Sequence, residues 1–370
     1  MSMQVSYKKQ IVLMSLFIII LFAICEIILN VYDFTSYKCE FLKHDEVFPN
    51  YTDEELNNIC KTTYDLKIDP INLEFNPNQI SGNVKINNFG FRGEDITREK
   101  TENTYRIFMI GGSTTFGVVV NDNETIPYYL QEILNEKNHD FTIEVINAGI
   151  LSSWSYNEVE KIKKKIVNFE PDMIIIYDGW NDVSFGKPES EIQSTYDFRI
   201  FGEDEELNVV EQIRAVLRES KLISAANRAL FFGNSELLHY NRTVVPFDNS
   251  LLEIKVIEWK NRISEICEIG NSKGFSTVVI IQPMAGSGNR TLSDTEKLYF
   301  IRYDHENLLK GLSEYAEALN EVNSCSLTLD FRNVLDEVNH PVYFDQGHMG
   351  SFGNEFIAKK IAEKISPILN

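Results

Sequence analysis

The chain has 370 residues, which is long for one ordinary domain and fits an α/β domain with additions. Its composition, with 43% hydrophobic and 24% charged residues, is typical of a globular protein and excludes a wholly disordered or collagen-like chain. The 35 basic and 55 acidic residues give a net charge of −20, which would repel a phosphate backbone, so nucleic-acid binding is not expected.

The first predicted element is an apolar segment at residues 11–29, which follows a short N-terminal tail. Only Ser15 and Glu26 interrupt the run, and its 19 residues nearly cross a hydrocarbon core of about 30 Å at the helical rise. Because Lys8 and Lys9 precede it, we interpret the segment as a single membrane anchor with the rest of the chain outside the cytoplasm.

Three other interpretations of this segment stay open. A cleaved signal peptide is less favoured, because the apolar run is long and no small-x-small cleavage site follows it. Lipid attachment at Cys25 is disfavoured by the bulky Ile24 before it. A buried core helix is disfavoured because the run is not amphipathic.

Residues 30–104 are polar and irregular, and they are predicted to form a juxtamembrane stalk or small subdomain. Of the five cysteines, four remain when Cys25 is set aside, an even set with three connectivities. We expect two disulfides, Cys39–Cys60 and Cys267–Cys325. The second pair lies at the amino ends of the last two predicted strands, about one strand apart. No cysteine pair has the spacing of zinc ligands, so no metal site is predicted.

From residue 105 onward, short apolar runs alternate with helical stretches, which defines a domain at 105–370. Five runs are predicted to be strands: 105–112, 141–147, 172–177, 276–282 and 326–331. Helices are expected at about 126–134, 158–167, 251–269 and 293–320. This alternation predicts an α/β fold with a doubly wound parallel five-stranded sheet, because parallel strands need crossover helices.

Residues 183–250 interrupt the alternation after the third strand. A loop of this length is usually functional or carries structure of its own. We predict an insertion with seven aromatic residues, Phe185, Tyr196, Phe198, Phe201, Phe231, Phe232 and Tyr240. It either covers the active-site edge of the sheet or packs at its side.

Polar residues follow the predicted strands at the edge where ligands bind to an open parallel sheet. They form four blocks, Gly111–Gly117, Asn147–Gly149, Gly179–Asp182 and Asp345–His348. Each block alone would be ordinary turn or helix-capping chemistry. In this order and at these strand ends, the four blocks are better explained as one site.

The four blocks together resemble the SGNH hydrolases, the GDSL-like lipase and esterase superfamily, over residues 105–366. The segment Asn87–Gly93 is similar to the lead-in of membrane-anchored bacterial members. The resemblance implies a flavodoxin-like fold and the catalytic residues Ser113, Asp345 and His348. It also implies an oxyanion hole made by the Ser113 amide, the Gly149 amide and the Asn181 side chain. One departure is Gly112, where the family has aspartate before the serine.

The chemistry explains these residue types. A neutral serine is a poor nucleophile, so Ser113 needs His348 to take its proton as it attacks an acyl carbon. Asp345 can hold the imidazole tautomer and stabilise the imidazolium. Donors around the developing oxyanion can each contribute roughly 3 kcal/mol.

These residues predict a serine esterase or deacylase that hydrolyses short, acetyl-type esters, with an acylated carbohydrate outside the cytoplasm as the expected substrate. An O-acyltransferase that modifies a surface glycan would use the same residues. A catalytically dead surface-binding module is a third possibility, but it would have no chemical reason to keep all five predicted site residues. No nucleotide cofactor is expected, because the sequence has neither a Walker-type loop nor a dinucleotide fingerprint.

Overall fold

The computed structural model describes residues 6–36, 45–69, 73–137, 140–184, 186–190, 251–297 and 305–369. The N-terminal helix and the sheet belong to two different compact units. Residues 45–104, for which the sequence predicts a stalk or small subdomain, belong to the same compact unit as the sheet.

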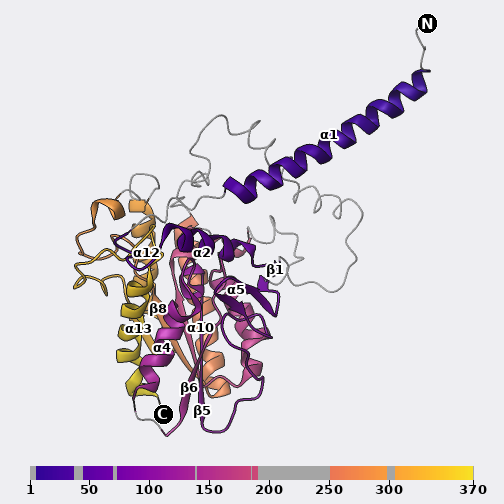
Figure 1. Ribbon diagram of the computed structural model, residues 1–370. Coiled ribbons are helices and arrows are strands. Elements are labelled where there is room, and N and C mark those ends of the chain that lie inside the picture. Colours follow the sequence, from indigo (N-terminus) through magenta and orange to yellow (C-terminus); the bar gives the residue numbers. More distant parts are fainter. Residues whose placement is uncertain are drawn as a thin grey trace. The chain divides into compact units, whose positions relative to one another are not determined.

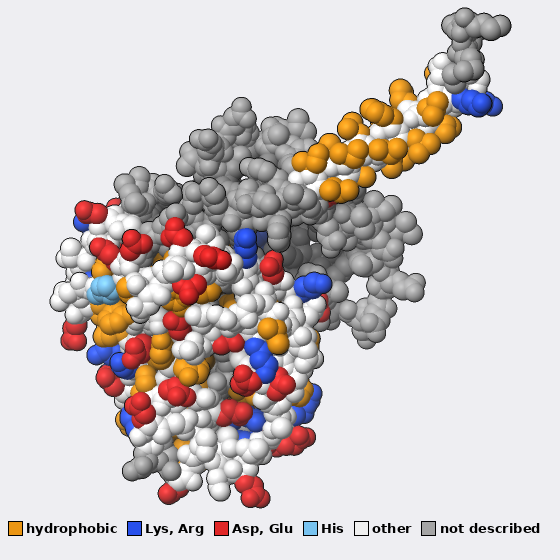
Figure 2. Space-filling model, viewed as in Figure 1, with side chains coloured by type: hydrophobic (Ala, Val, Ile, Leu, Met, Phe, Trp, Pro, Cys, Tyr) orange, Lys and Arg blue, Asp and Glu red, His pale blue; other side chains and the backbone are white. Residues whose placement is uncertain are grey.

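Helix α1, Tyr7–Ser36, contains the predicted apolar segment. Its part Tyr7–Ile28 has a mean hydropathy of 3.0 and is long and apolar enough to cross a membrane. Figure 2 shows hydrophobic side chains on this helix and basic side chains at its N-terminal end. An N-terminal signal sequence has the same features, so the helix is a candidate for either role.

The sheet has the predicted five parallel strands, in the order β6-β5-β7-β8-β9. Their bounds are β5 Thr104–Gly111, β6 Thr142–Asn147, β7 Met173–Asp178, β8 Ser276–Ile281 and β9 Leu327–Asp330. The chain moves from β5 to one side and then returns to the other side for β7. In open α/β sheets, ligands bind next to such a reversal, at the carboxyl ends of the strands.

Helices cover both faces of the sheet (Figure 1). One face packs against α4, Ile126–Asn135, and α13, Ser351–Ile365. The other packs against α5, Ser155–Lys164, α10, Leu252–Lys273, and α12, His305–Leu319. Side chains of β5 alternate between the two cores, because successive residues of a strand point to opposite faces. The predicted α/β fold is therefore confirmed.

The segment before the sheet forms small elements. They are α2 Asp53–Asp65, β1 Ile68–Asp69, β2 Glu74–Phe75, β3 Gln79–Ser81 and β4 Val84–Ile86. Strands β1 and β2 pair antiparallel, as do β3 and β4. Isolated bridges then join Ile86 to Arg92 and Arg92 to Asn147, so this segment reaches the end of β6.

The predicted disulfide Cys267–Cys325 is confirmed, with a Cα–Cα distance of 4.7 Å. It joins α10 to the chain just before β9. Cys60 is also disulfide-bonded, and Cys39, its predicted partner, lies outside the described residues. Most of the predicted insertion, including all seven aromatic residues, also lies outside them.

Candidate active site

Ser113 lies at the carboxyl end of the central strand. Strand β5 ends at Gly111, Gly112 is the N-cap, and Ser113 begins the short helix α3, Ser113–Phe116. The Ser113 Oγ atom is 2.7 Å from Nε2 of His348. This is hydrogen-bond distance, as a serine nucleophile and its base require.

Asp345 and His348 lie on one loop between β9 and α13. His348 Nδ1 is 2.6 Å from Oδ2 of Asp345. The other carboxylate oxygen, Oδ1, accepts the backbone N–H groups of Gly347 at 2.9 Å and His348 at 2.7 Å. The ring of Phe344 stacks on the imidazole at 5.8 Å between centroids. Serine, imidazole and carboxylate therefore form a continuous hydrogen-bonded chain.

The surroundings of Asp345 favour its charged form. Burial acts to raise the pKa of this carboxyl, but the His348 ring and the two backbone N–H groups outweigh burial and hold the pKa below its usual range. A carboxylate here can orient the imidazole and stabilise its protonated form.

The Asn181 side chain lies directly over Gly112. Asn181 belongs to α6, Trp180–Ser184, which follows β7, and its Nδ2 donates to the carbonyl of Ser153 at 2.5 Å. A Cβ atom on Gly112 would lie 2.3 Å from this Nδ2. Gly112 has an extended backbone that any residue can adopt, so space rather than conformation requires glycine here. The absence of a side chain at Gly112 leaves room for the Asn181 amide.

The Gly149 N–H, which the sequence predicts as an oxyanion donor, already has a hydrogen-bond partner. The Gly149 N–H donates to Asn147 Oδ1 at 3.1 Å, and a Cβ at this position would lie 2.3 Å from the nitrogen of Phe116. Gly149 therefore allows the loop after β6 to pack against α3. Three residues later, the exposed Ser152 has a positive φ of 60°. The backbone N–H of Ser152 has no hydrogen-bond partner among the described residues. The next residue is Ser153, whose carbonyl accepts the Asn181 side chain.

Arg92 is a site residue whose role the sequence did not reveal. It is buried, and its guanidinium donates to the carbonyls of Phe116 at 2.9 Å, Gly117 at 2.6 Å and Val120 at 2.7 Å. Its Nε donates to Asp122 at 2.7 Å. Arg92 thus satisfies the carbonyl end of α3 and fixes the helix that begins with Ser113. Arg92 belongs to the segment Asn87–Gly93, which the sequence identifies as a motif. Its role was not predictable, because the residues that it contacts are distant in sequence.

Gln282 and Met284, which follow β8, pack beside the loop that carries Asp345 and His348. Gln282 is buried, accepts a hydrogen bond from Thr114 Oγ1 at 3.3 Å, and lies 3.1 Å from Met284 Sδ. A Cβ atom on Gly347 would meet Met284 Cε at 2.4 Å. Met284 is therefore in close contact with the loop that carries Asp345 and His348.

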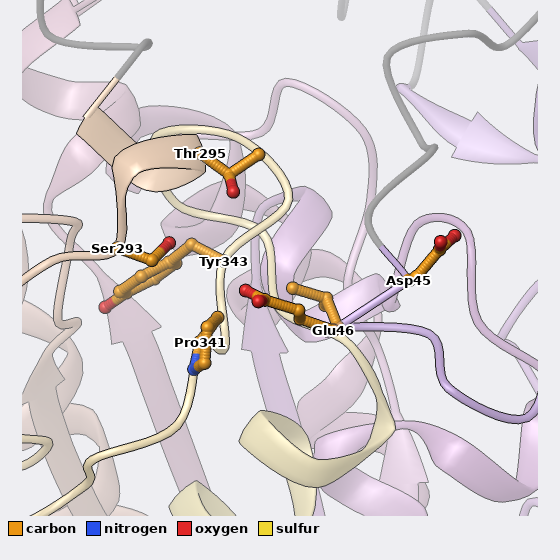
Figure 3. A pocket seen from close by; sticks show the side chains of 7 residues that line it. Asp45, Glu46, Ser293, Thr295, Pro341 and Tyr343 are labelled. Carbon is orange, nitrogen blue, oxygen red and sulfur yellow. The ribbon is translucent and has the colours of Figure 1, made fainter.

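A separate cavity of about 200 Å³ lies beside the chain that leads to the triad loop (Figure 3). Its lining is Asp45, Glu46, Val47, Ser293, Thr295, Pro341 and Tyr343, which includes none of the predicted site residues. Across the part of the chain that is described, no three His, Cys, Asp or Glu side chains are grouped as metal ligands. The candidate active site is thus the Ser113 region.

No family model and no curated protein matches the sequence of this chain. Solved structures of esterases and lipolytic proteins are similar to it. A protein assigned to the lipolytic G-D-S-L family from Desulfitobacterium hafniense DCB-2 is 14% identical, with a TM-score of 0.39 over 70% of this chain and 98% of its own. An acetylxylan esterase from Geobacillus stearothermophilus is 12% identical, with a TM-score of 0.40 over 72% and 96%.

A lipase/acylhydrolase from Enterococcus faecalis is also 12% identical, with a TM-score of 0.40 over 72% of this chain and 97% of its own. Likeness of this degree does not establish an activity, so the chemistry rests on the geometry around Ser113.

Proposed function

We propose that the protein is a serine esterase that hydrolyses short acyl esters. The observation that carries this proposal is the hydrogen-bonded chain Ser113–His348–Asp345 at the carboxyl end of β5. His348 Nε2 takes the proton of Ser113 Oγ while the oxygen attacks the acyl carbon. The protonated imidazole then gives this proton to the leaving alcohol, and water releases the acyl group from Ser113 by the same steps.

The oxyanion of the tetrahedral intermediate needs donors next to Ser113. The Ser113 N–H at the start of α3 and the Asn181 Nδ2 are two of the three predicted donors. We assign the third place to the Ser152 N–H instead of the predicted Gly149 N–H, because Gly149 already donates to Asn147. The backbone fixes the two N–H groups, and the hydrogen bond to the Ser153 carbonyl fixes the Asn181 amide. Such preorganised donors stabilise developing charge without reorganisation.

The surroundings support a small acyl group on an uncharged alcohol. Gln282 and Met284 pack against Gly347 in the loop that carries His348, and we propose that they limit the length of the acyl group. The net charge of −20 would repel anionic lipid headgroups. Figure 2 shows acidic side chains spread over the visible face of the sheet unit. An acylated carbohydrate fits these conditions better than a phospholipid.

The apolar helix α1 is the basis for the proposed location. We interpret it as a retained membrane anchor, with the catalytic residues outside the cytoplasm, as Lys8 and Lys9 before it favour. The substrate is then an ester at the cell surface. The catalytic proposal is independent of this topology, because it depends only on the residues around Ser113.

The full chain in detergent micelles, assayed with 4-nitrophenyl acetate, tests the activity. Ser113→Ala should reduce turnover by roughly 10⁴-fold or more, because the nucleophile is lost. Ser272→Ala, at the exposed end of α10, is the matched control and should keep wild-type turnover. Inactive wild-type protein that is folded by its thermal transition, or an active Ser113→Ala variant, would overturn the proposal.

A further inference from the structure

A buried polar layer lies beneath Asn181. Asp182, the next residue, is 1% exposed and accepts the Ser155 N–H at 3.1 Å and the Ser155 Oγ–H at 2.5 Å. Arg262 of α10 donates its Nε to the same hydroxyl oxygen at 3.0 Å. Asp182 thus ties α6 to the start of α5, and thereby holds Ser153, two residues earlier, against the Asn181 amide.

Glu158, one turn along α5, lies next to this connection. It is 1% exposed, and neither carboxyl oxygen has a partner of hydrogen-bond geometry among the described residues. The charged groups that face it are Asp182 on α6, Asp178 on β7 and Lys161 on its own helix, and Arg262 of α10 lies 3.8 Å from Asp182. Lys161 already donates to a backbone carbonyl, and Arg262 is shared with surface carboxylates.

Burial of a carboxylate that no donor meets at hydrogen-bond geometry favours the protonated form of the group. Burial and then the charge of Asp182 raise the pKa of Glu158 to about 8, although the Ser153 side chain and Lys161 lower it in part. Burial, followed by Asp182 and Glu158, also raises the pKa of Asp178. Asp182 differs from both groups in its contacts, because its carboxylate oxygens accept the N–H and the Oγ–H of Ser155.

We propose that Glu158 is a positioning residue for the oxyanion hole, and that it holds Ser153 and Asn181 in place only while it carries a proton. Loss of this proton puts two like charges next to each other in a buried site, and their repulsion separates α5 from α6. Asn181 then loses its fixed position over Gly112, although the contacts among Ser113, His348 and Asp345 are unchanged. This inference rests on the proposed esterase function.

The pH dependence of kcat for 4-nitrophenyl acetate tests the proposal between about pH 6 and about pH 9.5. The wild-type protein should lose activity above the pKa of Glu158, about 8. Glu158→Gln, which mimics the protonated group, should keep its activity, and at the alkaline end its kcat should exceed that of the wild type roughly tenfold. The effect belongs in kcat, because oxyanion donors act mainly in the transition state.

Glu160→Gln is the matched control on the same helix. Glu160 pairs with Lys163 and Lys164 near the surface and should keep the wild-type profile when replaced. Lys161 is the competing explanation, because burial lowers its pKa to about 8 as well. If the alkaline loss persists in Glu158→Gln, the titrating group is not Glu158 and the proposal is wrong.

A second readout does not need activity. Because the folded protein holds the Glu158 proton more tightly than the unfolded chain, wild-type stability should fall as pH rises from about 4.5 toward about 8. Glu158→Gln should lack this part of the decline in melting temperature. If the wild-type protein is inactive but its melting temperature differs from that of Glu158→Gln in this way, the esterase proposal is wrong and the protonated Glu158 stands. If the protein is active but the two melting profiles are identical, Glu158 does not carry the proposed proton.

Asp182→Asn decides the question if Glu158→Gln does not fold. In Asp182→Asn a deprotonated Glu158 meets no negative charge at position 182, so the alkaline loss of activity should become much smaller than in the wild type. An alkaline loss as large as that of the wild type in this variant would overturn the proposal.

Discussion

Two groups of carboxyls at the same edge of the sheet have opposite surroundings. Asp345 accepts two backbone N–H groups and the His348 ring, and these interactions hold its pKa low. Glu158 and Asp178 are at least as buried but have unpartnered oxygens within the described residues, and their pKa values are raised. The comparison teaches that the supply of donors, rather than burial alone, decides which carboxyl carries charge. A charged carboxylate can assist His348, whereas a neutral carboxyl can be buried next to the segments that carry Ser153 and Asn181.

The largest expected effects come from the charged side of this comparison. His348→Ala should reduce kcat on the order of 10⁶-fold, because the base in contact with Ser113 Oγ is lost. Asp345→Asn should cost about 10⁴-fold, since an amide holds the imidazole in the wrong tautomer. Steady-state kinetics with 4-nitrophenyl acetate measures both. If Asp345→Asn were nearly as active as the wild type, the charge on Asp345 would have no part in catalysis.

A smaller effect is expected on the oxyanion side. Gly112→Ala would place a Cβ at 2.3 Å from Asn181 Nδ2 and displace this amide, at a cost of about 10²-fold in kcat. The double variant with Asn181→Ala is the control. If Gly112→Ala acts only by displacing the amide, it should cost nothing further once Asn181 has been replaced. Full additivity of the two losses would contradict this explanation.

The sequence was sufficient for the features that are local. Alternating apolar runs predicted the five strands, and Asp345 and His348 lie three residues apart on one loop, so their contact could be expected from the motif. The Cys267–Cys325 bridge was also predicted, because both cysteines flank neighbouring strands. In each case the partners are close in sequence or placed by the sheet.

The sequence was insufficient for contacts that three or more elements create. Glu158 reads as a polar residue of an amphipathic helix, yet it is buried against groups from β7 and α6. Gly149 reads as an oxyanion glycine, but its N–H is used by Asn147. Arg92 reads as a polar residue of an irregular segment and is in fact buried beneath α3. Only the packing of distant segments reveals these roles.

The central claim is that Ser113 is a nucleophile activated by His348. Its most direct test is to treat the full chain with a fluorophosphonate, which reacts with activated serines, and to locate the adduct by peptide mass spectrometry. The account predicts a single adduct on Ser113 that is absent in His348→Ala. An adduct on a different serine, or ester hydrolysis that continues while Ser113 stays unmodified, would contradict it.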